Sequence, residues 1–312
     1  MSTVSVDICI ATYKRPQMLI KLLDSISKLN LYGINMRIIV VDNDPMGSAH
    51  ASIDSFRSRI PLDIKYVIES ERGISHARNR ALDLVQANYI AFVDDDEYVT
   101  PDWLQVMLIN LIKYNADAVF GPVQKVLPYS ASSWAYELSI FKRNSKPTGT
   151  FVNHGPTGNV LFKTETIKKL HLRFDPSFSL TGGEDSDFFY RMYLHGNTLV
   201  WCDEAVIYEE VPKERLNKKW ILRRSFRGGQ SFFRVFVRRY PLKKKMQWLL
   251  LKPLQVFFGI LILPFMRIVS YGVYLNWLCR VSAAVGQLSM IFGERFLYHE
   301  YSQKVYRNAT VN

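Results

Sequence analysis

The chain is poor in cysteine, with three among its 312 residues. Cys9, Cys202 and Cys279 are an odd number and show no Cys-x-x-Cys spacing, which argues against a disulfide framework or a zinc site. The first residues also lack the basic, long apolar and small-residue regions of a secretory signal. We therefore expect a reducing, cytoplasmic compartment.

Two glycine patterns that bind phosphate are missing. No Gly-x-Gly-x-x-Gly follows the first predicted strand, which disfavours a dinucleotide-dependent dehydrogenase. No Gly-x-x-x-x-Gly-Lys-Ser/Thr is present either, which disfavours a phosphate-cradle nucleotide hydrolase. Apolar residues are plentiful, at 48 % of the chain, so the sequence can bury a sizeable core.

Acidic residues are scarce relative to basic ones, 28 against 40, which gives a formal charge of +12. The excess is local: residues 213–245 contain 13 Lys or Arg and one acid, Glu214. Such an excess indicates an anionic partner, either nucleic acid, an anionic membrane or an anionic substrate. We therefore treat residues 1–212 and 213–312 as separate parts.

Between residues 6 and about 122, short apolar runs alternate with helical patterns, which predicts βα units around a mostly parallel, Rossmann-like sheet flanked by helices. Helices are predicted to begin at Pro16, after Thr100-Pro101-Asp102 and within residues 182–196. Polar clusters follow the first, second and fourth strands, and we expect them to converge, because ligands bind beyond the carboxyl ends of such strands. The predicted strands are residues 6–11, 37–42, 63–68, 89–94, 117–121 and a later strand-like run at 198–208.

Residues 253–293 are the most apolar part of the chain, with Arg267 and Arg280 as the charged residues. Neither side of Arg267 reaches the ~20 apolar residues of a spanning helix. Pro253, Gly259 and Pro264 are expected to interrupt the segment. We therefore favour an in-plane or re-entrant amphipathic hairpin over two spans, with a buried helical subdomain as the alternative. The basic block favours the membrane, because each Lys or Arg near an anionic leaflet contributes about 1 kcal/mol.

An acidic cluster, Asp94-Asp95-Asp96-Glu97, directly follows a strand expected to be buried. Four carboxylates at one strand end repel one another unless a positive group is present. A hard divalent cation, Mg²⁺ or Mn²⁺, fits these oxygen ligands, especially when it bridges a diphosphate. A solvated acidic loop that caps the next helix is the alternative, and it accounts for only one or two of the acids.

Other candidate residues lie at strand ends and helix starts. Thr12, Tyr13 and Arg15 follow the first strand, where the helix that starts at Pro16 could present N–H groups to an anion. Asp42 and Asp44 lie at the end of the second strand, as ribose-binding acids do in nucleotide-binding sheets, although this sequence is also an ordinary turn.

Two helix starts carry charges that need an explanation. Arg78 lies early in a predicted helix, where positive charge opposes the helix dipole, so an anionic partner is expected. Glu184 and Asp185 begin another helix after two glycines and are the best candidates for a catalytic base, although acids at a helix start also act as simple caps.

Five segments together resemble glycosyltransferase family 2 in order and spacing. The resemblance covers about residues 5–210 and is nearest to the bacterial exopolysaccharide branch, including succinoglycan-type glucosyltransferases. The segments are residues 9–16, 38–45, 73–82, 90–104 and 182–192.

The resemblance implies a GT-A fold in residues 1–212, with a nucleotide half at about 1–122 and an acceptor half at 123–212. Residues 213–312 would form a helical membrane-associating region. A Mn²⁺ or Mg²⁺ ion would be held by Asp94 and Asp96, and Asp185 would be the base, with Glu184 beside it. The implied nucleotide-sugar contacts are Thr12, Tyr13, Arg15, Asp42, Asp44, Arg78, Asp94 and Asp95.

The function that follows is an inverting transfer of a sugar from a nucleoside diphosphate sugar, UDP-linked in our hypothesis, to a hydroxyl of a lipid-linked saccharide. Asn153, His154 and Asn159 lie in a glycine-rich stretch that we expect to bind the acceptor. The Gln/Arg-x-x-Arg-Trp motif of processive synthases is not present, so addition of a single sugar is expected. We place the enzyme on the cytoplasmic face of the inner membrane, peripheral or monotopic, against an anionic surface.

Three other classes remain as alternatives. A nucleic-acid-binding protein could use residues 213–245, but the acidic strand ends would repel its ligand, so no nucleic acid is expected. A sugar-nucleotide pyrophosphorylase would share the sheet and the metal, but it normally opens with a glycine-rich loop. A catalytically silent membrane scaffold would not need the acidic motifs. The sequence leaves the oligomeric state open.

Overall fold

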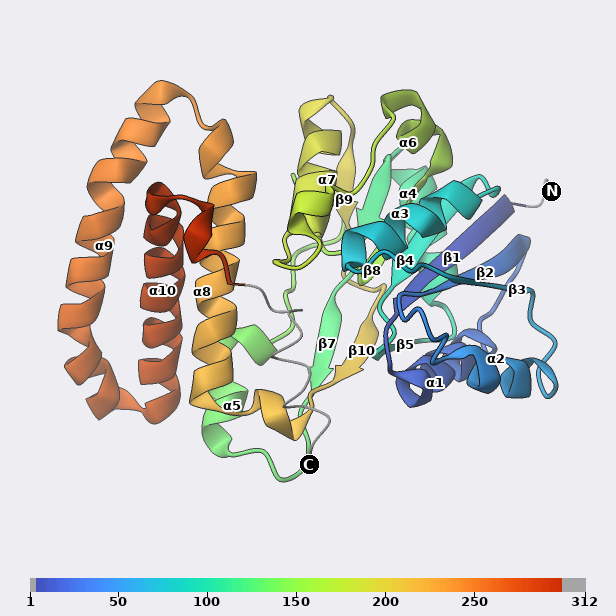
Figure 1. Ribbon diagram of the computed structural model, residues 1–312, viewed down its shortest axis with the longest axis horizontal. Coiled ribbons are helices and arrows are strands. Elements are labelled where there is room, and N and C mark those ends of the chain that lie inside the picture. The colour runs from blue at the N-terminus through green and yellow to red at the C-terminus, as the bar shows by residue number, and fades with distance from the viewer. Residues whose placement is uncertain (1–3, 299–312) are drawn as a thin grey trace. The chain divides into compact units, whose positions relative to one another are not determined.

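The computed structural model describes residues 4–298 (Figure 1). Its contacts divide these residues into two compact units. The sheet unit comprises residues 4–124, Arg143–Ser179 and Glu184–Glu209. The helical unit comprises Lys125–Lys142, Leu180–Gly183 and residues 210–298. The part of the predicted membrane region at residues 299–312 lies outside the described residues.

The sheet unit is built on a seven-stranded sheet with the order β3-β2-β1-β4-β8-β6-β9. All neighbours pair in parallel except β8, which is antiparallel to β4 and β6. This confirms the predicted mostly parallel sheet. The strands are β1 (Val4–Thr12), β2 (Ile34–Asp42), β3 (Ile64–Ile68), β4 (Tyr89–Val93), β6 (Ala118–Phe120), β8 (Asn159–Lys163) and β9 (Leu199–Trp201).

Helices cover both faces of this sheet, because successive strand residues point to opposite sides. Ile8 and Ile10 of β1 belong to one apolar core, and Cys9 between them belongs to the other. Pro16 begins its helix as predicted. The helices are α1 (Pro16–Ile26), α2 (His50–Arg57), α3 (Ile74–Leu84), α4 (Trp103–Lys113), α6 (Thr164–Leu170), the 3₁₀ turn η2 (Pro176–Phe178) and α7 (Glu184–Leu194).

One strand prediction needs correction, and the short strand after the acidic cluster was not predicted. The run at residues 198–208 is two strands, because Asp203 turns the chain by accepting hydrogen bonds from Arg143 and Ser145. The acidic cluster runs directly into a short strand, β5 (Glu97–Val99), which pairs with β10 (Ile207–Glu210). Together with β7 (Val123–Val126) these form a second sheet, in the order β5-β10-β7.

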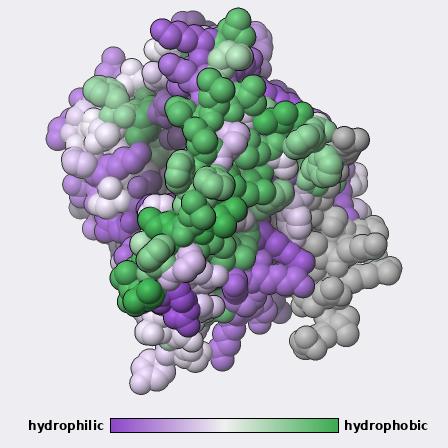
Figure 2. Space-filling view, turned by 90° about the vertical axis from the view of Figure 1, so that its left-hand side faces the viewer, coloured by the Kyte–Doolittle hydropathy of each residue, from purple (hydrophilic) through white to green (hydrophobic). Residues whose placement is uncertain are grey.

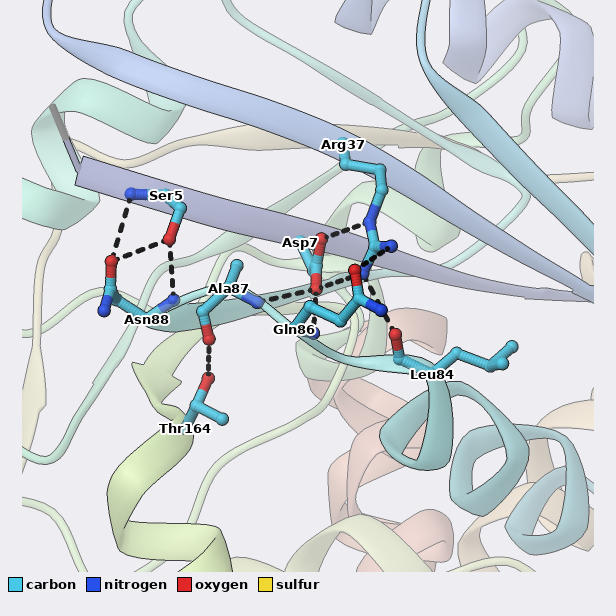
Figure 3. Close-up of polar contacts among 8 residues, drawn as sticks. All are labelled: Ser5, Asp7, Arg37, Leu84, Gln86, Ala87, Asn88 and Thr164. Carbon is cyan, nitrogen blue, oxygen red and sulfur yellow. Dashed lines mark hydrogen bonds and ion pairs between the residues drawn. The ribbon is translucent and has the colours of Figure 1, made fainter.

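A polar network holds the sheet edge where β1 and β4 begin (Figure 3). The buried carboxylate of Asp7 accepts two 2.8 Å hydrogen bonds from Arg37 and others from the N–H groups of Gln86 and Ala87. Burial opposes ionisation of Asp7, but these donors outweigh it and lower the pKa of this group. The ionised form therefore stabilises the fold above the usual aspartate pKa, and this stabilisation is lost as the pH falls through the lowered pKa.

The helical unit is a layer of three long helices, with α10 packed against both α8 and α9. Gly229 of α8 and Gly286 of α10 lie at the contact between their helices, where the other helix's backbone fills the space of a side chain. The elements are α5 (Ser133–Glu137), η1 (Ser139–Phe141), η3 (Lys213–Arg215), α8 (Lys218–Val235), η4 (Val237–Arg239), α9 (Leu242–Val269), α10 (Tyr271–Ser289), η5 (Met290–Phe292) and η6 (Glu294–Phe296).

The expected interruption of the apolar segment is wrong. Helix α9 continues through Pro253 and Pro264, although each ring removes a backbone hydrogen bond and crowds the carbonyl group four residues earlier. Gly259 instead gives close contact with Val281 of α10. With 28 residues, α9 is long and apolar enough to cross a membrane, and only 6 % of its most apolar 18-residue window is buried.

The α8–α10 contact predicts opposite effects for two adjacent glycines. A methyl group at Gly229 would overlap the Ala283 carbonyl, whereas Gly228 has open space around it. Gly229→Ala should lower the free energy of unfolding by about 1–3 kcal/mol through overpacking. Gly228→Ala should raise it by up to about 1 kcal/mol through helix propensity. Chemical denaturation in detergent measures both, and equal effects would contradict the close packing.

Candidate active site

The carboxyl ends of β1 and β4 bring two of the predicted clusters together. Thr12 Oγ1 donates a 2.7 Å hydrogen bond to Asp95 Oδ2, and Arg15 Nη1 lies 3.2 Å from both Asp95 Oδ1 and Asp96 Oδ2. These strands are parallel neighbours, so their ends meet at one edge of the sheet. The predicted convergence of the first and fourth strands is therefore present.

The acids of the cluster have different surroundings. The Asp95 side chain is 7 % exposed, and burial raises its pKa to about 7, although the charge of Arg15 acts in the opposite direction. Glu97 accepts a 2.8 Å hydrogen bond from the backbone N–H of Asp94 and so closes the turn. Asp94 is 44 % exposed, which leaves its carboxylate accessible to a ligand.

Arg78 of α3 joins this cluster to the second acidic motif. Its Nη1 lies 2.5 Å from Glu184 Oε1, and its Nη2 lies 3.1 Å from Asp94 Oδ1. The Arg78 side chain is 5 % exposed, and its guanidinium lies 5.7 Å from the centre of the Phe174 ring. The anionic partner expected for Arg78 is therefore a pair of carboxylates, one directly after β4 and one at the start of α7.

The end of β2 forms a tight turn. Asp42 is fully buried, and its carboxylate accepts hydrogen bonds from the Ala49 and Asp44 N–H groups and from the Tyr66 hydroxyl. Asp44 is 4 % exposed and accepts from the Met46 N–H. The structure thus places both acids within the turn.

Asn43, which lies in the motif segment 38–45 but had no role assigned to it, joins this turn to the start of α3. It accepts from the Gly73 N–H and donates to the Glu69 and Glu71 carbonyls. Tyr13 lies beside the turn after β1, half-buried, with the Lys14 ammonium 5.3 Å from its ring centre.

A cavity of ≈ 580 Å³ opens beside Asp185. Asn153 and His154 line it too, so three of the predicted site residues share one cavity. Glu184 has a 9 % exposed side chain held by Arg78, whereas Asp185 faces the cavity. Sequence reasoning missed the rest of the lining, which has no local motif and includes Asn144, Lys146, Phe151, Tyr193 and Trp201.

Asn159 does not lie with Asn153 and His154. It is fully buried, accepts a 2.8 Å hydrogen bond from Trp103 Nε1, and donates to the carbonyls of Pro122 and Ala205. Its amide therefore joins β8 to α4 and two loops. The proposed acceptor site does not include Asn159.

The donor set at Asp94 and Asp96 suits a cation that takes few protein ligands. Within residues 4–298, no group of three or more His, Cys, Asp or Glu side chains is arranged to hold a metal ion. Mg²⁺ is commonly bound by only one or two carboxylates, with substrate phosphates and water completing its shell. Asp94 and Asp96 supply that number of hard oxygen ligands, so they fit such an ion.

Two family models match most of the chain. Residues 89–292 match glycosyl transferase family group 2, and residues 7–170, more than half of the chain, match glycosyl transferase family 2. The chain belongs to glycosyltransferase family 2. This confirms the resemblance of the five motif segments and makes the protein an enzyme of sugar transfer.

Proteins similar to this family 2 glycosyltransferase include a succinoglycan biosynthesis protein and a bacterial glycosyltransferase. The succinoglycan biosynthesis protein ExoM of Rhizobium meliloti is 35 % identical over 238 residues, which are 76 % of this chain and 77 % of that protein. Glycosyltransferase GlyA of Streptococcus pneumoniae is 25 % identical over 229 residues, 69 % of this chain but 32 % of that protein. The family and the succinoglycan relative together support a bacterial polysaccharide glycosyltransferase that uses a nucleotide sugar.

Among solved structures, residues 1–349 of S. aureus TarS are similar in fold to this glycosyltransferase. The TM-score is 0.54 at 15 % identity, and the match covers 93 % of this chain and 92 % of that one. A further TarS structure, in complex with UDP-GlcNAc, matches with the same TM-score at 14 % identity. The likeness confirms the predicted GT-A fold.

Proposed function

We propose that the enzyme transfers one sugar from a UDP-linked donor to a hydroxyl of a lipid-linked saccharide, with inversion at the anomeric carbon. The geometry that carries this proposal is the Asp94–Arg78–Glu184 chain of ion pairs, which fixes a strand-end acidic cluster beside the base candidate Asp185. The family, the succinoglycan relative and the UDP-GlcNAc complex of TarS support it.

The donor binds at the carboxyl ends of β1, β2 and β4 in this proposal. A Mn²⁺ or Mg²⁺ ion held by Asp94 and Asp96 would supply positive charge opposite the departing diphosphate. Arg78 is buried and fixed, so its charge stabilises the developing negative charge without reorganisation. The remaining donor contacts are Thr12, Tyr13, Arg15, Asp42, Asp44 and Asp95.

The acceptor binds in the cavity beside Asp185, where Asn153 and His154 can hydrogen-bond its hydroxyl groups. The acceptor oxygen attacks the anomeric carbon from the face opposite the leaving group, its proton passes to the Asp185 carboxylate, and the diphosphate leaves with the electron pair of the broken C–O bond. Tyr193 and Trp201 give the cavity the apolar lining that is usual in ligand sites. Glu184 is held by Arg78, so its role in this proposal is to orient the first turn of α7.

In this proposal the enzyme docks through its helical unit on the cytoplasmic face of an anionic membrane. Figure 2 shows a broad apolar patch on the side where α9 lies in Figure 1. Large side chains of α9 such as Leu250, Phe258 and Ile268 are 61–83 % exposed, and such a surface needs a partner. The basic residues between 213 and 245 suit anionic headgroups, so we propose a monotopic enzyme.

Membrane extraction tests this attachment. Insertion of α9 predicts that detergent releases the enzyme from membranes, whereas 1 M salt does not, because salt screens charge but leaves apolar burial intact. Immunoblots of the soluble and membrane fractions measure the release. Complete release by salt alone would contradict insertion and leave a purely electrostatic attachment.

Substitution of the base tests the proposed reaction. Asp185→Asn keeps the size of the side chain but cannot take the proton, so transfer from the donor that the wild-type enzyme uses should fall by about 10²- to 10⁴-fold. Calorimetry should give UDP affinity in the presence of Mn²⁺ equal to that of the wild type. Asp24→Asn on α1, an exposed surface acid, should change neither quantity.

The donor site is tested in the same calorimetry. Asp96→Asn should abolish the Mn²⁺-dependent part of UDP binding, because Asp96 is a proposed ligand of the ion.

Two outcomes would contradict the proposed function. Substantial transfer by folded Asp185→Asn enzyme would contradict the role of the base. Failure of the folded wild-type protein to bind any nucleoside diphosphate would contradict the donor site.

A further inference from the structure

The four residues before the base segment belong to a different unit from their neighbours in sequence. The chain is in the sheet unit up to Ser179 and again from Glu184, but Leu180–Gly183 pack with the helical unit. Gly183 is bonded directly to Glu184, the first residue of α7. The backbone that leads into Glu184 and Asp185 is therefore held by contacts in the helical unit.

Three side chains on one face of α8 make these contacts. Ser231 Oγ donates a 3.0 Å hydrogen bond to the Gly182 carbonyl, and Arg234 Nη1 donates a 2.7 Å bond to Thr181 Oγ1. A Cβ at Gly182 would lie 3.1 Å from Arg227 Nη1, so Arg227 packs against this glycine. Positions 227, 231 and 234 follow the i, i+4, i+7 spacing that places residues on one helix face.

The segment needs this support because its own sequence does not fix its shape. Gly182 and Gly183 have φ values of +75° and +99°, a region that glycine enters freely, so many other conformations are open to them. Thr181 and Arg234 are 3 % and 4 % exposed. Burial of an arginine is costly unless it is hydrogen-bonded. Here the buried Arg234 donates one of its hydrogen bonds to Thr181, in the segment before the base.

We propose that Ser231 and Arg234 are positioning residues for Asp185, and that they act through the segment Leu180–Gly183 that leads into α7. The inference rests on the proposed role of Asp185 as the base. A general base must lie within hydrogen-bond reach of the acceptor hydroxyl, and a displacement of about 1 Å can cost about 10²-fold in rate. Loss of the Ser231–Gly182 bond loosens the peptide that sets the start of α7.

Two serine substitutions in the helical unit provide a matched test. Ser231 donates to Gly182, whereas Ser282 of α10 donates a 2.9 Å bond to the Leu222 carbonyl of α8, away from the segment. Each Ser→Ala change removes one hydroxyl-to-carbonyl bond from the same unit. In detergent, Ser231→Ala should lower kcat about tenfold or more with KM for the UDP-sugar within about twofold, because the donor site is untouched.

The conservative and control variants separate positioning from general stability. Ser231→Thr keeps the hydroxyl and should retain most of the activity, and Ser282→Ala should have wild-type kcat. Amide hydrogen exchange should become faster at residues 181–186 in Ser231→Ala and stay unchanged there in Ser282→Ala. Equal kcat and equal exchange in Ser231→Ala and the wild type would overturn the proposal, as would equal losses in both alanine variants.

The Asp185→Asn enzyme distinguishes the two ways of failing. An inactive Asp185→Asn enzyme together with a fully active Ser231→Ala enzyme would leave the base in place and overturn only the positioning role. An active Asp185→Asn enzyme would overturn the base itself, and the positioning proposal with it.

Discussion

The site depends on one buried guanidinium. Arg78 pairs with Asp94 at the end of β4 and with Glu184 at the start of α7, and these acids are 90 residues apart in sequence. Buried charges are tolerated only when they are paired and hydrogen-bonded. Without Arg78 the two carboxylates would repel each other, and the donor side and the acceptor side of the site would lose their common anchor.

The fold makes this anchor possible. Parallel pairing of β1 and β4 brings Thr12 and Arg15 to the acidic cluster, and α3 carries Arg78 to the same edge of the sheet. Asp185 then faces the cavity because Glu184, its neighbour, is the acid held by Arg78. The two adjacent carboxylates therefore have different surroundings. In our proposal Glu184 orients the start of α7 and Asp185 accepts the proton.

Much of this could be predicted from sequence, because strand ends, helix starts and acidic clusters are local patterns. The partners of Arg78 could not, since they depend on which distant elements meet. Asn159 shows the same limit: its glycine-rich surroundings indicated a residue that binds the acceptor, but the amide joins buried elements. In α9, the two prolines predicted helix breaks, but the helix continues through both of them and loses one backbone hydrogen bond at each. The segment 180–183 carried no motif that would link it to α8.

The most direct test of this account is a comparison of Arg78→Lys with Arg80→Lys. Both keep the charge, but only Arg78 is buried and bridges two acids, which lysine cannot do with a planar fork. The bridging role of Arg78 predicts that Arg78→Lys lowers kcat by about 10²-fold or more, since the link between donor and base is lost, and that Arg80→Lys matches the wild type. Wild-type turnover by folded Arg78→Lys enzyme would contradict the central role of this link.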